Sequence, residues 1–223
     1  MAVRLNFNVP EHSGMTSART RARLAERLRA SGIADEALLG VMAEVPRHAF
    51  VDQALAHRAY DDVSLPIGYS QTISQPYIVA RMTELVLGAS GRQKVLEIGT
   101  GCGYQTTVLA QFFHTVHSIE RVGGLARAAR ERLAGLGVRN VRLRHGDGSQ
   151  GWANAAPFDA IMITAAAPIL PEALIGQLAV GGRLVFPVGV AEQELRMIER
   201  TADGCLETRL EKVRFVPLLP GVA

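Results

Sequence analysis

The chain has 223 residues, 48% of them hydrophobic, and a formal net charge of +3 at neutral pH. This length and composition predict one domain with a full apolar core and exclude a disordered chain. The positive excess is small. The arginines between Arg4 and Arg29 are expected to lie on a solvated helix face, so the sequence predicts no nucleic-acid partner.

Cysteine content and hydropathy indicate the reduced interior of a cell. The two cysteines, Cys102 and Cys205, cannot build a disulfide framework. No uncharged apolar run reaches the ~18 residues of a membrane span, and residues 1–15 lack the apolar centre of a secretory signal. We therefore expect a cytoplasmic protein that does not bind membranes, and we expect a monomer.

The first part of the chain predicts helices. Residues 1–16 show little periodicity and are expected to be a flexible tail, and residues 17–90 are expected to form a helical cap with a substrate loop. Leucines at helical spacing predict a helix from Ser17 to Gly32. Asp35 fits the N-cap of a second helix over 36–44, and a third, short helix is expected over 47–56.

A long loop is predicted from Tyr60 to Gln75, where hydroxyl and amide side chains alternate with prolines. Long loops inside a compact domain are often functional. Pro76 fits the first turn of a helix that continues over 77–87. Ser74 can be the N-cap of this helix or a functional hydroxyl, and periodicity alone favours the cap.

Residues 91–223 are predicted to be a cofactor-binding α/β core with strands at its C-terminal end. The apolar run Val95–Ile98 suits a strand buried on both faces, and three alternating glycines then precede a helix over 105–113. A strand, a glycine loop and a helix open many nucleotide-binding domains. The dinucleotide fingerprint would place its third glycine at Tyr104, so the loop fits a nucleoside without pyrophosphate better.

Acidic residues stand at the ends of the predicted strands. Glu97 would repel a pyrophosphate and attract a cationic sulfonium or ammonium group. Glu120 ends a strand over 114–120 and lies 17 residues beyond Gly103, near the ~20-residue offset at which a carboxylate binds ribose hydroxyls. Asp147 follows a strand over 140–144 and could accept a hydrogen bond from an adenine amino group. A solvated strand end remains the alternative for Glu120, and a simple turn remains the alternative for Asp147.

The rest of the chain predicts strands over 157–164 and 183–188, separated by a helix over 171–178 that stops at Gly181 and Gly182. Two further strands, 194–200 and 207–218, flank a turn at 202–204. The pattern predicts an α/β protein with a doubly wound, mostly parallel sheet and an N-terminal helical cap.

The segment Gln71–Pro76, together with seven further segments given below, makes the chain resemble the bacterial protein-L-isoaspartate O-methyltransferases. The segment Gln71–Pro76 is specific to that family, whereas the glycine loop is shared by many methyltransferases. The resemblance runs from about Ser17 to the C-terminal end. It departs at Ser70, where the family generally has glycine, and at Cys102, where it often has serine. The other matching segments are Leu65–Gly68, Ala80–Leu85, Val95–Gly101, Arg144–Gly148, Thr164–Pro168, Gly182–Val185 and Arg214–Leu218.

The resemblance implies a Rossmann-like class I methyltransferase that uses S-adenosyl-L-methionine and releases S-adenosyl-L-homocysteine. It implies methylation of the free carboxylate of L-isoaspartyl residues in damaged proteins and peptides, which starts repair through a succinimide. It implies no metal. By resemblance Ser74 is the catalytic hydroxyl, and Gln71, Thr72 and Ile73 line the substrate pocket. The implied cofactor-binding residues are Glu97, Gly99, Thr100, Gly101, Glu120, Asp147 and Gly148.

Three other functions remain open on the sequence. The same cofactor could serve methylation of another carboxylate, in a peptide or a small acid. An NAD-dependent oxidoreductase is a different class, and Tyr104 argues against it. The third is a binding module that keeps the cofactor crevice without catalysis, and the hydroxyl-rich loop argues against that.

Overall fold

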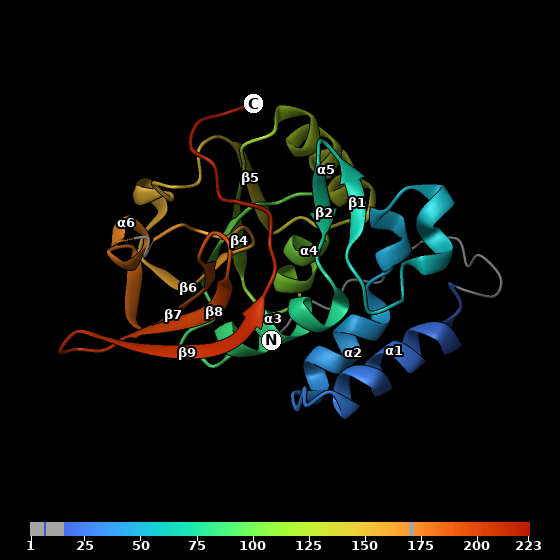
Figure 1. The fold of residues 1–223 in the computed structure, drawn as a ribbon, viewed down its shortest axis with the longest axis horizontal. Helices are drawn as coiled ribbons and strands as arrows, with labels where there is room; N and C mark the ends of the chain where they lie inside the picture. The colour runs from blue at the N-terminus through green and yellow to red at the C-terminus, as the bar shows by residue number, and fades with distance from the viewer. Residues whose placement is uncertain (1–6, 8–15, 170–171) are drawn as a thin grey trace.

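The computed structural model describes residue 7, residues 16–169 and residues 172–223. Within this part of the chain, helices surround a seven-stranded sheet, and a two-stranded sheet lies apart from it (Figure 1). Of the predicted tail, Phe7 packs against the core and Thr16 is buried. The rest of the tail prediction lies outside the described residues.

The first two predicted helices are confirmed, with their caps. In α1 (Ala18–Ala30) the Ser17 hydroxyl accepts a hydrogen bond from the Thr20 amide. In α2 (Glu36–Glu44) the Asp35 carboxylate accepts one from the Leu38 amide at 2.9 Å. The single helix expected next is wrong. Two 3₁₀ turns, η1 (Arg47–Phe50) and η2 (Gln53–Arg58), replace it, because Asp52 caps a new turn at the Ala54 amide.

The predicted loop contains a β-hairpin. Strand β1 (Leu65–Gly68) pairs antiparallel with β2 (Gln71–Ile73). The connecting residues Tyr69 and Ser70 have φ of +53° and +55°, as tight hairpin turns require. Ser70, where the resembling family generally has glycine, therefore stands in a left-handed conformation that glycine adopts more easily.

Helix α3 (Pro76–Leu87) follows the hairpin, with Pro76 at its start as predicted. Its N-cap is Gln75, whose own side chain makes no capping hydrogen bond; the Asp62 carboxylate instead accepts one from the Tyr77 amide at 2.8 Å. Ser74 is thus not the N-cap that periodicity favours, and its hydroxyl is free for another role.

The large sheet has the order β5-β4-β3-β6-β7-β8-β9, and the strands from β5 to β7 run parallel. After β3 the chain builds outward on one side through β4 and β5, and then returns to the other side at β6. The predicted doubly wound α/β architecture is confirmed, with its switch point beside β3. The strands are β3 (Lys94–Ile98), β4 (Thr115–Glu120), β5 (Val141–His145), β6 (Phe158–Ile163), β7 (Leu178–Val188), β8 (Gln193–Arg200) and β9 (Cys205–Val213).

Helices α4 (Tyr104–Ala110), α5 (Gly123–Gly135) and α6 (Glu172–Ile175) complete the fold. The helix expected over 171–178 ends early because β7 already begins at Leu178, and its residue 171 lies outside the described residues. Gly181 and Gly182, interpreted as a helix stop, lie inside β7. The last strand ends at Val213 rather than at residue 218.

One apolar core joins the helical part to the sheet. Leu28 of α1 and Val86 of α3 belong to the same buried cluster as Val95 of β3 and Leu109 of α4. The boundary expected at residue 90, between the helical cap and the α/β core, therefore does not separate two apolar cores. The division of the chain into these parts stays a proposal. No helix among the described residues is long and apolar enough to cross a bilayer.

Candidate active site

The glycine loop lies at the carboxyl end of β3, beside the switch point of the sheet. Gly99, Gly101 and Gly103 have φ of +98°, +55° and +90°. A Cβ atom on Gly99 would come within 2.3 Å of the Thr164 hydroxyl oxygen. The Gly99 amide donates to the carbonyl of Ile119 at 2.8 Å, which ties the loop to β4. The positive φ favours glycine at all three positions, and close packing adds to this at Gly99.

Glu120 holds the loop from the end of β4. Its two carboxylate oxygens accept hydrogen bonds from the amides of Gly101 at 2.8 Å and Val122 at 2.9 Å. The Glu120 side chain is 5% exposed. It lines a cavity of about 70 Å³ together with Gly99, Gly101 and Gly148. Each oxygen keeps a second lone pair, so the carboxylate can still accept from ligand hydroxyls.

The C-terminal segment crosses this cavity, which we call the cofactor cavity. Pro217, Leu218 and Leu219 line it. Asp147 accepts hydrogen bonds from the Gly221 amide at 2.6 Å and the Ser149 amide at 2.8 Å, and these bonds lower the pKa of its carboxyl. Asp147 thus anchors the C-terminal segment in this structure. Its predicted contact with adenine remains a prediction.

Glu97 lies beneath the glycine loop, in the core. It is fully buried, and one carboxylate oxygen accepts from the hydroxyls of Thr106 at 2.5 Å and Ser118 at 2.6 Å. The other oxygen is buried without a hydrogen-bond partner. Burial raises the pKa of Glu97 to about 8. Glu97 is absent from the lining of the cavities described here, so a direct cofactor contact remains a prediction.

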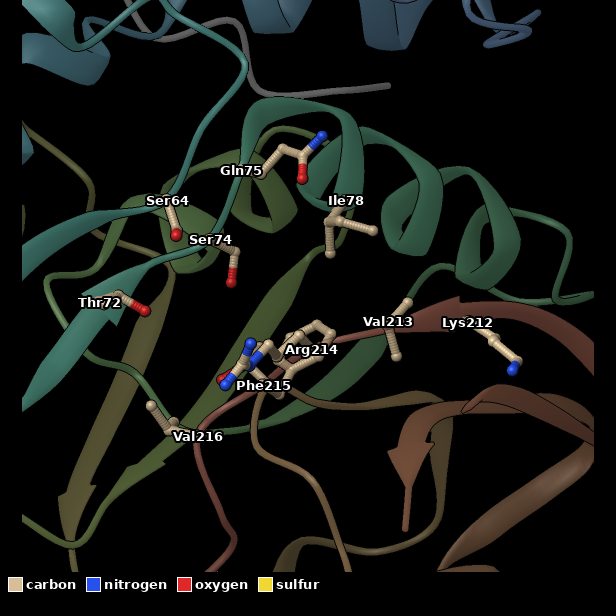
Figure 2. Close-up of a pocket in the computed structure, with 11 residues that line it drawn as sticks. Ser64, Thr72, Ser74, Gln75, Ile78, Lys212, Val213, Arg214, Phe215 and Val216 are labelled. Atoms are coloured by element: carbon tan, nitrogen blue, oxygen red, sulfur yellow. The ribbon is translucent and has the colours of Figure 1, made fainter. Parts of the chain in front are cut away.

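A larger cavity of about 570 Å³ lies between the hairpin strand β2 and the segment after β9. Figure 2 shows the hydroxyls of Ser74 and Thr72 pointing into it toward the guanidinium of Arg214. Phe215 and Val216 form part of the facing wall. We call this the substrate cavity, because it combines hydroxyl donors with a cationic side chain.

Threonines join the two cavities. Thr72 and Thr164 line both the cofactor cavity and the substrate cavity. A narrow cavity of about 40 Å³ brings Ser74 together with Gly99 and Thr100. Ser74, whose hydroxyl is predicted to be catalytic, thus lines both this narrow cavity beside the glycine loop and the substrate cavity.

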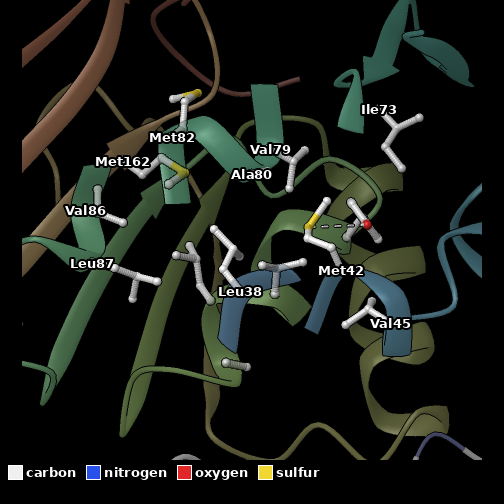
Figure 3. Packing of buried hydrophobic residues seen from close by; sticks show 14 of the residues in the cluster. Leu38, Met42, Val45, Ile73, Val79, Ala80, Met82, Val86, Leu87 and Met162 are labelled. Atoms are coloured by element: carbon white, nitrogen blue, oxygen red, sulfur yellow. Dashed lines mark hydrogen bonds between the residues drawn. The ribbon is translucent and has the colours of Figure 1, made fainter. Parts of the chain in front are cut away.

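The other predicted substrate residues differ in their surroundings. Gln71 lines the cofactor cavity, whereas Ile73 is 4% exposed, belongs to the main apolar core (Figure 3) and lines the narrow cavity beside Ser74. Thr72 alone of these three lines the substrate cavity. Within the described part of the chain, no group of three or more metal-ligating side chains is found.

Comparison with known proteins decides the family. The family described as protein-L-isoaspartate(D-aspartate) O-methyltransferase matches residues 19–223. The chain belongs to this family. The predicted recognition is confirmed, and the assignment removes the NAD-dependent alternative.

Members of the protein-L-isoaspartate O-methyltransferase family resemble the chain over nearly its full length. The enzyme of Chromobacterium violaceum is 57% identical over 221 residues, 99% of each chain. That of Nitrosomonas eutropha is 56% identical over 210 residues, 93% of this chain and 95% of its own.

A solved structure supports the fold class. The protein-L-isoaspartate O-methyltransferase of Plasmodium falciparum, in complex with S-adenosyl-L-homocysteine, superposes with a TM-score of 0.79 at 27% identity. The match covers 89% of this chain and 98% of that one. The predicted class I methyltransferase fold is thereby confirmed.

Cys102, the second departure from the family pattern, lies in the glycine loop. Its side chain is 5% exposed and belongs to the main apolar core, and burial raises the pKa of its thiol. A buried thiol behaves as a small hydrophobic group. A cysteine is therefore accommodated at this position of the loop.

Sequence reasoning missed two features of the site. Arg47 lies buried behind Ser74 and donates to its carbonyl oxygen, and no local pattern indicated this. The segment after β9 also lines the site, and this was missed because the sequence pattern was interpreted as a continuing strand. The resemblance to the family over Arg214–Leu218 was the signal that could have indicated it.

Proposed function

We propose that this chain transfers a methyl group from S-adenosyl-L-methionine to the free carboxylate of L-isoaspartyl residues in damaged proteins and peptides. The methyl ester then closes to a succinimide, which starts repair. One observation carries the proposal. In a chain of this family, the Ser74 hydroxyl stands where the substrate cavity meets the glycine loop.

The residues around the glycine loop fit the cofactor. Glu120 lines the cofactor cavity and each of its oxygens can accept one more hydrogen bond, which suits the two ribose hydroxyls. Gly99 and Gly101 have no side chains, so a ligand can approach their backbone closely. A Cβ atom at either position would also crowd a neighbouring side chain. When bound, S-adenosyl-L-methionine supplies a methyl group that its sulfonium already activates.

The substrate carboxylate is oriented by the chain's own donors. The Ser74 hydroxyl donates a hydrogen bond to one carboxylate oxygen, and the guanidinium of Arg214 attracts the negative charge. Catalysis then rests on alignment, because well-oriented reactants gain ~7–11 kcal/mol over free ones. No covalent intermediate and no metal is required.

An isoaspartyl linkage carries its free carboxylate on the main chain, so the enzyme must recognise backbone. An extended peptide lying along the segment from Tyr60 to Gln75 would be read through backbone hydrogen bonds, which accounts for tolerance of many neighbouring side chains. The proposed enzyme acts as a cytoplasmic monomer on proteins and peptides, without nucleic-acid or membrane partners.

The test is methyl transfer from labelled S-adenosyl-L-methionine to an isoaspartyl peptide and to its aspartyl twin of the same sequence. We expect label in the isoaspartyl peptide only, and labelling that is roughly tenfold to a hundredfold slower when Ser74→Ala replaces the parent enzyme under the same conditions. Equal labelling of both peptides would reject the repair function. It would favour the alternative, a methyltransferase for another carboxylate in a peptide or small acid.

A further inference from the structure

A separate cavity of about 310 Å³ lies at the opposite edge of the sheet from the candidate active site. Its lining comes from the beginnings of three neighbouring parallel strands, through Lys94 of β3, Thr115 of β4 and Arg142 of β5. The glycine loop follows the other end of β3, and Glu120 ends β4 on that same side. The cavity, which we call the basal cavity, therefore belongs to neither the cofactor site nor the substrate site.

The charged side chains that line the basal cavity, among the described residues, are both cations. The Lys94 ammonium is held in place, because it donates to the Ala155 carbonyl at 2.6 Å and lies 5.8 Å from the centre of the Phe158 ring. An ammonium group has three donors, so two remain. Arg142 is exposed at the mouth. Thr115 and Asn154 add neutral donors.

His117 gives the second, independent observation. Its side chain is 3% exposed and lines the cavity, and its Nδ1 atom is buried without a hydrogen-bond partner. Its ring meets the rings of Trp152 at 5.1 Å and Phe158 at 5.4 Å, edge to face. Buried polar atoms in folded proteins nearly always have partners. The incomplete hydrogen bonding of His117 marks it as an unsatisfied polar side chain in the lining of the cavity.

The charged groups that shift the pKa of His117 have the same sign. Burial, Arg142 and Lys94 together lower the pKa of His117 to about 4, so the ring is neutral near neutral pH. Both charged groups that act on it are cations. An anion in the cavity would lie between two like charges and relieve their repulsion.

We propose that the basal cavity binds a compact oxyanion of the phosphate class. The Arg142 guanidinium offers a planar fork that matches two phosphate oxygens, and the Lys94 ammonium offers a fixed point charge. His117 and Thr115 complete the hydrogen bonds from the strands. The ligand is inorganic phosphate or the phosphate group of a small organic monoester, since the two present the same chemistry to these donors.

Intrinsic fluorescence tests this directly, because Trp152 is the single tryptophan of the chain and lines the basal cavity. The full-length protein is titrated with sodium phosphate, and separately with glycerol phosphate, against sodium chloride at equal ionic strength. We expect a saturable change with one or both phosphates and none with chloride. Saturation by phosphate alone identifies the free ion, and saturation by glycerol phosphate alone identifies a monoester.

Two variants of equal charge change make the test specific. Arg142→Gln removes an exposed cation from the cavity mouth and should weaken the apparent phosphate affinity about tenfold or more. Arg23→Gln removes an exposed cation from α1 and should leave the affinity unchanged. A response that is absent, that does not saturate, or that is equal in both variants would overturn the proposal.

Discussion

The Nη2 atom of Arg47 donates a hydrogen bond to the carbonyl oxygen of Ser74 at 2.8 Å. Arg47 is completely buried, and its Nε atom donates to the carbonyl of Ala59 at 2.8 Å. The guanidinium also lies 4.9 Å from the centre of the Tyr104 ring, in the helix that follows the glycine loop. One side chain therefore links the helical part, the substrate loop and the cofactor-side helix, and Ser74 is positioned by it.

Arg47→Lys should destabilise the protein and displace Ser74. Lysine keeps the charge but cannot reproduce the planar fork, so carbonyls of the loop lose their donor. We expect a loss of about 2–3 kcal/mol in the free energy of unfolding, measured with urea, and a raised KM for an isoaspartyl peptide. Arg23→Lys, on the exposed side of α1, is the matched control and should change stability by less than about 0.5 kcal/mol. Equal stability of the two variants would contradict the role of Arg47.

Ser74→Ala should lower kcat while cofactor affinity stays nearly unchanged. The substitution removes one donor to the substrate carboxylate but keeps the carbonyl that Arg47 holds. A hydrogen bond to a charged group is worth ~1.5–3 kcal/mol, so we expect a loss of roughly tenfold to a hundredfold in kcat. Ser64→Ala, at a hydroxyl that lines the same cavity, is the control. A large loss of S-adenosyl-L-homocysteine binding in Ser74→Ala would show that Ser74 is structural.

Glu120→Gln should weaken the binding of S-adenosyl-L-homocysteine by about 1–3 kcal/mol, measured by calorimetry. Glutamine accepts through one oxygen only, so it loses either the bond from Gly101 or the bond from Val122, in addition to ligand contacts. Glu131→Gln removes one negative charge from the exposed side of α5, away from the cofactor cavity, and should bind S-adenosyl-L-homocysteine as tightly as the parent. Unchanged affinity in Glu120→Gln would remove this carboxylate from the cofactor site.

Gly221→Pro should speed release of S-adenosyl-L-homocysteine. Proline removes the amide that donates to Asp147, and it cannot adopt the φ of +75° found at Gly221. Loss of a hydrogen bond to a carboxylate would raise the dissociation rate by roughly tenfold, measured by stopped flow. Val222→Ala keeps that amide in the same segment and should release at the parent rate. If both variants release equally, the C-terminal segment does not retain the ligand.

The parts of the site that are local in sequence could be predicted. The strand, the glycine loop and the following helix are continuous in the chain, and Glu120 ends the next strand, so the parallel sheet necessarily brings them to one edge. The helix caps Ser17 and Asp35 were equally local, because a cap satisfies amides only two or three residues away.

The features that the sequence left undecided or missed are those whose geometry depends on distant packing. Strand β3 is covered on both faces, so its pattern does not tell whether Glu97 faces the ligand or the core. The hairpin turn was missed because Tyr69 and Ser70 take left-handed conformations without the usual glycine or asparagine. The contact between Arg47 and Ser74 spans 27 residues and follows no periodicity.

Glu97 makes stability depend on pH in a defined direction. Its pKa is about 8 in the folded protein and 4.5 in the absence of burial, so between these values the folded state holds a proton that the unfolded state has lost. The contribution of Glu97 to stability is therefore fully present below pH 4.5 and is lost as the pH rises through about 8. The expected slope across this window is on the order of 1 kcal/mol per pH unit.

Glu97→Gln should abolish that slope, because an amide does not titrate. Urea unfolding of both proteins across the window gives the difference in stability between them, in which the titration of other groups cancels. We expect the parent to lose stability relative to Glu97→Gln as the pH rises from 4.5 to 8, and the difference to level off on either side. Glu131→Gln, at an exposed carboxylate, should show no such trend. A difference that stays constant across the window would mean that Glu97 is ionised in the folded protein throughout.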